Sequence, residues 1–115
     1  DIANLVEEIE SLGRQQRQEL RNRLGVLLGH LLNWEFQPER RSKSWVATVR
    51  EQRREIINLL AESPSLKPYL TEAIVAGFQS GLDLVVRETS LTYNDLPVSC
   101  SYTAQQILSS DYLPD

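Results

Sequence analysis

The sequence contains one cysteine, Cys100, and no methionine among its 115 residues. A single thiol cannot form an internal disulfide, and it cannot supply the several thiolates of a structural zinc site. Such sparing use of cysteine is typical of a reducing compartment, and we therefore expect a cytoplasmic protein. Because no methionine is present and the helical pattern is already running at Asp1, we also expect a further N-terminal segment in the natural protein.

Long hydrophobic runs are also missing. The longest apolar stretch, from Val26 to Leu32, is interrupted by Gly29 and is far shorter than the roughly 20 residues of a membrane span. No charged-then-apolar leader opens the chain, so we expect neither a membrane protein nor a secreted one. With 41% apolar and 24% charged residues, the composition is that of a folded domain, and we expect one helical domain over residues 1–115.

Motifs that carry chemistry are absent as well. The sequence has no glycine-rich phosphate loop, no nucleophile elbow and no metal-ligand pair at helical spacing, and each of these is a common local signature of an active site. We therefore assign no catalytic residue, no metal site and no cofactor.

Helical periodicity is what the sequence does have. From Ile2 to Trp34 the apolar residues recur every three or four positions, which predicts one long helix, bent at most at Gly13. Pro38 turns the chain, and a second helix follows, capped by Ser42 or Ser44 and ending near Glu62.

The third and fourth helices have weaker signals. Ser65 is the predicted cap of the third, which places Pro68 in its first turn and continues to about Thr89, with Gly77 and Gly81 on its apolar face to allow close approach of a neighbour. Thr103 and Gln106 have the spacing of a capping box for a short last helix. The predicted fold is all-α and bundle-like: a long first helix packed with two antiparallel helices and a short capped C-terminal helix.

One polar and aromatic cluster is a candidate ligand site, consisting of His30, Trp34, Trp45 and Arg53. Counting outward from the turns of antiparallel helices sets Trp34 beside Trp45, His30 beside the stretch that ends at Arg53, and Trp45 near Gly81. The structural alternative is a hydrogen-bonded histidine, core tryptophans, and an arginine whose stem covers the core while its head reaches water or a carboxylate.

The basic residues gather in the centre of the chain, between residues 14 and 54. A candidate basic patch consists of Arg14, Arg17, Arg21, Arg40, Arg41, Arg50 and Arg54. Such a patch is one requirement for nucleic-acid binding, but the net charge of the chain is −4, and we expect no surface-exposed Tyr or Phe interleaved with the arginines for base stacking. A solvated charged face is therefore the favoured interpretation. The same count brings Glu88 opposite Arg40, Arg41 and Lys43, where it would clasp the end of the bundle.

Four stretches of the chain resemble the domain of unknown function 29 family. They are Leu5–Gly13, His30–Ser42, Ser44–Arg53 and Ser63–Leu66, and the closing residues Cys100–Tyr102 and Asp111–Pro114 extend the resemblance over most of the chain. The resemblance implies an all-α bacterial protein, found mainly in cyanobacteria, with a further N-terminal helical segment. It implies no activity, cofactor or functional residue.

Together these observations favour a noncatalytic protein–protein interaction module. Because the long first helix should overhang its shorter partners, part of its apolar stripe needs a cover, either the N-terminal segment or a second copy, and we expect a homodimer. The alternatives are nucleic-acid binding through residues 14–54, and an enzyme or small-ligand binder that uses the cluster around His30 and Arg53.

Overall fold

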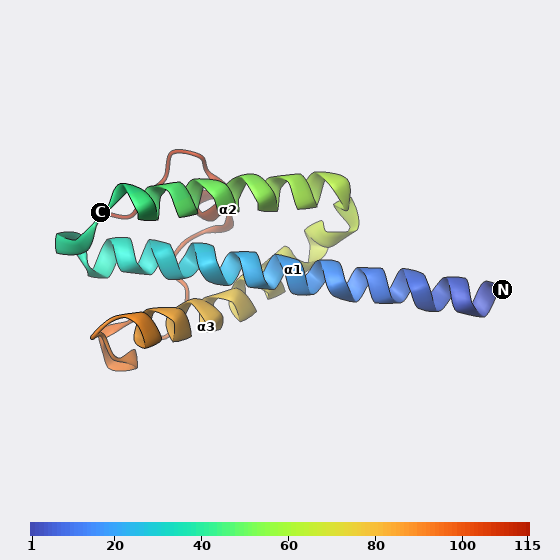
Figure 1. Cartoon of the computed structure of the whole chain (residues 1–115), viewed down its shortest axis with the longest axis horizontal. Coiled ribbons are helices and arrows are strands. Elements are labelled where there is room, and N and C mark those ends of the chain that lie inside the picture. Colours follow the sequence, from blue (N-terminus) through green and yellow to red (C-terminus); the bar gives the residue numbers. More distant parts are fainter.

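One helix of 35 residues, α1 (Ile2–Phe36), is the axis of the fold. The computed structural model describes every residue from Asp1 to Asp115. Helix α1 passes through Gly13 without interruption, as the periodicity predicts. Its N-terminal part projects from the body of the protein (Figure 1), so that the molecule measures 57 × 27 × 22 Å.

Helices α2 (Lys43–Glu62) and α3 (Leu70–Glu88) lie on opposite sides of α1 (Figure 1). Short 3₁₀ helices connect them: η1 (Pro38–Arg40) joins α1 to α2, and η2 (Pro64–Tyr69) carries the chain from α2 to α3. Helix α2 is antiparallel to α1, and α3 is antiparallel to α2. The remainder of the chain, with η3 (Tyr93–Asp95) and α4 (Ala104–Leu108), runs back across the bundle towards α2. The predicted all-α bundle is confirmed.

Local signals fix most of the helix ends. The Ser42 side chain accepts a hydrogen bond from the backbone N–H of Trp45, so it is Ser42 that caps α2. The capping box of Thr103 and Gln106 at α4 is formed in both directions. These bonds occupy backbone donors that a helix end otherwise leaves unpaired.

The predicted start of the third helix is wrong. The chain from Pro64 to Tyr69 is 3₁₀ helix, and α3 begins only at Leu70, with no side-chain cap. Pro68 has no N–H to donate to an α-helical bond, and the tighter 3₁₀ turns accommodate it. Leu66, which the pattern places on the apolar face of the third helix, is nevertheless buried.

The contact between α1 and α3 is built on glycine. A Cβ atom placed on Gly81 would lie 2.9 Å from the backbone nitrogen of Gly29, and one placed on Gly77 would lie 2.8 Å from Cβ of Leu24. Gly25 and Gly29 on α1 have the same four-residue spacing as Gly77 and Gly81 on α3. The two backbones approach so closely because no side chain separates them.

The expected neighbourhood of Trp45 and Gly81 is therefore wrong. Gly81 faces Gly25 and Gly29 of α1, whereas Trp45 lies by Glu88 and the two residues after it. The prediction counted residues outward from a tight turn between α2 and α3. It fails because the six residues of η2 carry the chain from one side of α1 to the other, so that α3 begins later and does not lie along α2.

The core surrounds the second half of α1. From Leu20 onwards its leucines are fully buried against Val49 and Ile56 of α2 and Phe78 and Val85 of α3. Tyr102 and Ile107, on either side of the α4 cap, also belong to this core. No helix combines the length and hydropathy that a membrane span requires.

Candidate functional site

The four residues of the predicted ligand cluster do not surround one common pocket. His30 Nδ1 lies 2.8 Å from the carbonyl oxygen of Val26, one turn earlier in the same helix. Trp34 is covered by Arg41, whose guanidinium carbon lies 4.8 Å from the ring centroid. Among the main hollows of the surface, only Trp45 of the four contributes to the lining.

Arg53 is the member of the cluster with a clear structural role. Its side chain is buried, and it donates from Nε to the carbonyl of Ile107 at 2.8 Å and from Nη2 to those of Gln106 at 3.2 Å and Tyr112 at 2.7 Å. Burial lowers the pKa of Arg53, and the phenol of Tyr112 opposes that shift. The expectation that its head reaches water or a carboxylate is wrong, because the carbonyls at the end of α4 need donors and a buried guanidinium supplies them.

Most of the predicted basic patch is engaged within the protein. Arg21 donates to the Tyr69 hydroxyl at 2.7 Å, and Arg17 lies over the Tyr69 ring at 5.9 Å. Arg41 donates to the carbonyls of Trp34 and Asp115. Arg54 pairs with Glu55 at 3.6 Å.

The other three members lie apart from one another. Arg14 lies among the acidic side chains of the first turns of α1, Arg50 is exposed on α2, and Arg40 lines a hollow with Glu88. Glu88 and Arg40 therefore come together as the count predicts, but they form no ion pair, and Arg41 is occupied elsewhere.

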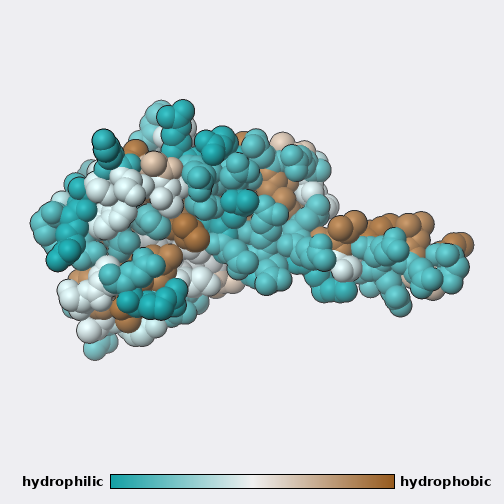
Figure 2. Space-filling view, viewed as in Figure 1, coloured by the Kyte–Doolittle hydropathy of each residue, from teal (hydrophilic) through white to brown (hydrophobic).

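The largest exposed apolar surface is on the projecting part of α1. Five side chains share this surface, which we call the α1 face: Ile2, Leu5, Val6, Ile9 and Leu12. Their exposed fractions run from 47% for Val6 to 81% for Ile2, and they form a brown band along the projection in Figure 2. The predicted overhang is thus present, and nothing in the 115 residues covers it.

The α1 face ends in a hollow at the point where α1 enters the body. Ile9, Leu12, Gly13 and Gln16 of α1 line it together with Ser65 of η2, and its volume is about 650 Å³. A helix lying along the α1 face would therefore meet a concave surface at this end.

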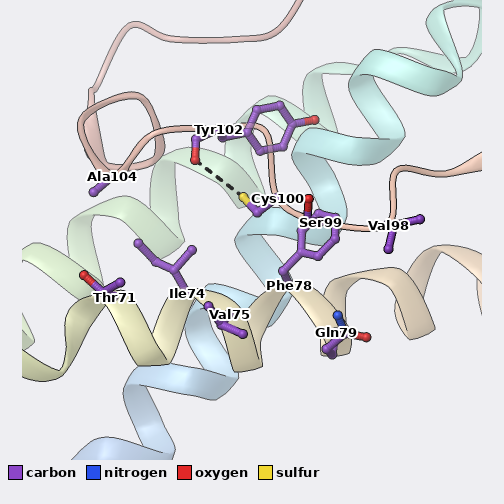
Figure 3. Close-up of a pocket in the computed structure, with 10 residues that line it drawn as sticks. All are labelled: Thr71, Ile74, Val75, Phe78, Gln79, Val98, Ser99, Cys100, Tyr102 and Ala104. Carbon is purple, nitrogen blue, oxygen red and sulfur yellow. Dashed lines mark hydrogen bonds between the residues drawn. The ribbon is translucent and has the colours of Figure 1, made fainter.

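A second hollow, mainly apolar and of about 380 Å³, lies between α3 and the chain before α4 (Figure 3). Ile74, Val75 and Phe78 form one wall, and Val98 and Cys100 face them. The Cys100 thiol donates to the carbonyl of Tyr102 at 3.5 Å. Burial raises the pKa of Cys100, so the sulfur is a thiol and not a nucleophilic thiolate near neutral pH.

Tyr102 anchors that part of the chain to α1. Its hydroxyl donates to the Glu35 carboxylate at 2.7 Å, and its ring meets that of Tyr112 edge to face at 6.2 Å. Burial and the bond to Glu35 raise the pKa of Tyr102 far above the ordinary range of a phenol. Sequence reasoning places Tyr102 beside the cap of α4 but not its partner on α1, because no local spacing links residues 35 and 102.

No group of three or more His, Cys, Asp or Glu side chains is placed to hold a metal ion. The pair Gly25 and Gly29 is the feature that sequence reasoning missed, although its spacing repeats that of Gly77 and Gly81. What the structure offers is an exposed apolar helix face and two kinds of hollow.

Comparison with known proteins adds a family and no activity. No curated protein and no solved structure matches the chain. The family model described as Domain of unknown function DUF29 matches residues 1–113, which is nearly the whole chain. The protein therefore belongs to the DUF29 family.

Proposed function

We propose that this protein is a noncatalytic protein–protein interaction module that associates through the α1 face, and that the occupant of this face is a second copy of the chain. The observation that carries the proposal is the exposure of five large apolar side chains on consecutive turns of one helix. Burying a Val, Leu or Ile side chain is worth about 1.5–3 kcal/mol, and contiguous exposed apolar surface of this kind is typical of an association site.

The hollow at the end of the α1 face favours a second copy lying antiparallel. The two α1 faces cover each other when the pair is centred near Glu7, because Ile2 then lies opposite Leu12 and Leu5 lies opposite Ile9. In that register the first turn of each α1 reaches the hollow of the other copy, which Ile9, Leu12 and Gln16 line together with Ser65.

Sedimentation equilibrium tests the proposal directly. We expect a dimer for the unaltered chain and a monomer for the double substitution Leu5→Ser with Ile9→Ser, which removes apolar area from the α1 face. Val75→Ser is the matched control, because Val75 is 63% exposed but lies on α3, and this variant should remain dimeric. A monomeric unaltered chain at concentrations of about 100 μM, well above the micromolar range of ordinary association, would exclude the second copy as occupant.

The arginines engaged by Tyr69, Trp34 and Glu55 give the nucleic-acid alternative no comparable support.

A further inference from the structure

A polar hollow lies at the end of the bundle opposite the α1 face. Its lining comes from the end of α1, from η1, from the first turn of α2 and from the end of α3, and consists of Gln37, Arg40, Trp45, Glu88, Thr89 and Ser90. We call it the Gln37 hollow. Its volume of about 310 Å³ is at the lower end of the range of small-molecule sites.

Gln37 brings an unpartnered buried amide to this hollow. The residue is 5% exposed, its Nε2 is sealed from solvent, and its side chain has no hydrogen-bond partner in the protein. Asn33, one helical turn earlier and 3% exposed, has an unpartnered Oδ1. Buried polar groups are nearly always paired, so the end of α1 beside this hollow is a place where the protein leaves polar atoms without a partner.

Two charges of opposite sign border the hollow without neutralising each other. Arg40 and Glu88 both line it, and neither takes part in any ion pair. Arg40 presents the planar donor fork that suits a carboxylate, and Glu88 is an acceptor for an ammonium group.

The remaining lining residues complete a site of defined chemistry. Trp45 is half-buried, and an indole face attracts a cation or an apolar chain. The Thr89 hydroxyl is already used, since it donates to the carbonyl of Val85 and accepts from the N–H of Leu91. Ser90 has no such bond and is the hydroxyl left for a ligand.

We propose that the Gln37 hollow binds a small zwitterionic molecule of the amino-acid type, with its carboxylate on Arg40 and its ammonium group between Glu88 and Trp45, against a wall that includes Gln37. The carboxylate and the ammonium group of such a molecule are a few ångströms apart, and the hollow carries complementary charges on the residues around one indole. This site is separate from the α1 face, so it stands or falls independently of the interaction proposed above.

Binding is tested with the free common amino acids as probes, each added in turn at neutral pH to the whole chain, with intrinsic tryptophan fluorescence and thermal unfolding as readouts. Because Trp34 also fluoresces, the fluorescence measurement uses Trp34→Phe. We expect at least one amino acid to change the Trp45 emission and to raise the unfolding temperature. Its N-acetyl and amide derivatives, which lack the ammonium and the carboxylate charge, should bind at least about 10-fold more weakly, a step of about 1.4 kcal/mol.

Variants at the two exposed charged positions keep the test specific. Arg40→Ala and Glu88→Gln should each weaken binding at least about 10-fold, and both should fold normally because the side chains are exposed. Arg50→Ala, an exposed arginine on α2 outside the hollow, is the matched control and should bind as the unaltered chain does. No binding of any amino acid up to about 10 mM, a limit weaker than the affinity of ordinary sites, would overturn the proposal. So would equal binding of the derivatives or of the Arg40 and Glu88 variants.

Discussion

Replacing Gly81 by alanine should drive α1 and α3 apart. The added Cβ would lie 2.9 Å from the nitrogen of Gly29, 3.2 Å from the carbonyl oxygen of Gly25 and 3.3 Å from the carbonyl carbon of Leu28. All three neighbours are backbone atoms of α1, and a helix backbone cannot turn aside as the end of a flexible side chain can. The two helices therefore have to separate along their whole contact.

The expected magnitude is the difference between two effects. Overpacking a well-filled contact costs about 1–3 kcal/mol, and the upper value applies here because every contact is with backbone. Alanine in place of glycine inside a helix stabilises the helix by about 1 kcal/mol, because its helix propensity is higher. Gly81→Ala should therefore lower the free energy of unfolding by about 2 kcal/mol, a large part of the 5–15 kcal/mol typical of a domain.

The matched control is Gly13→Ala, also inside a helix. A Cβ on Gly13 meets only Nη2 of Arg17, at 3.8 Å, so the substitution gains the helix propensity without a clash and should stabilise the protein by up to about 1 kcal/mol. Gly29→Ala should fall between the two, because its nearest contact, at 3.0 Å, is the end of the Leu84 side chain. Urea unfolding followed by circular dichroism, at one fixed protein concentration, measures all three. If Gly81→Ala proves as stable as Gly13→Ala, α1 and α3 do not approach as described.

Other predictions concern the chain after α3. Arg53→Met should lower the free energy of unfolding by about 3–5 kcal/mol, because the carbonyls of Gln106, Ile107 and Tyr112 lose the guanidinium that donates to them. Hydrogen exchange should rise first over α4, and protection of α4 equal to that of the unaltered chain would refute this. Tyr102→Phe should lower it by about 1–3 kcal/mol through loss of the bond to Glu35. Folding raises the pKa of Tyr102, so the contribution of its hydroxyl to the free energy of unfolding is complete below the unfolded pKa of about 10 and declines above it. The unaltered chain should therefore lose stability above about pH 10 more steeply than Tyr102→Phe does. Parallel pH profiles of the two proteins would contradict this. Because burial raises the pKa of Cys100, alkylation of its thiol near pH 8 should be at least several-fold slower in the folded chain than in urea. Equal rates would show that the folded protein does not shield the thiol.

Sequence periodicity predicts the helices well because one face of each is apolar over many turns. The α1 stripe from Ile2 to Trp34 predicts a single helix through Gly13, and the caps at Ser42 and Thr103 are local patterns that form as expected. The uncovered α1 face also follows from the unequal helix lengths. These features depend on neighbours within a few residues, which a sequence displays directly.

The features that sequence reasoning missed depend on residues far apart in the chain. The partner of Gly81 is Gly29, because α3 packs on α1 rather than along α2. The three acceptors of Arg53 are carbonyl groups, which every residue carries and no sequence pattern marks. Gln37 and Glu88 share a hollow only because η2 returns the chain along α1. None of these contacts follows from the spacing of residues within one helix.

The hydrogen bonds of Arg53 also determine at which stage of synthesis the core of the protein can fold. Its guanidinium lies on α2, in the middle of the chain, but its three acceptors lie in the last ten residues. While the chain is still being synthesised, packing α2 onto α1 would bury a cation with no acceptor, which is strongly unfavourable. The native core should therefore close only after residues 106–112 leave the ribosome, and a chain cut short before Gln106 should remain with its helices formed but its core open to chaperones and proteases.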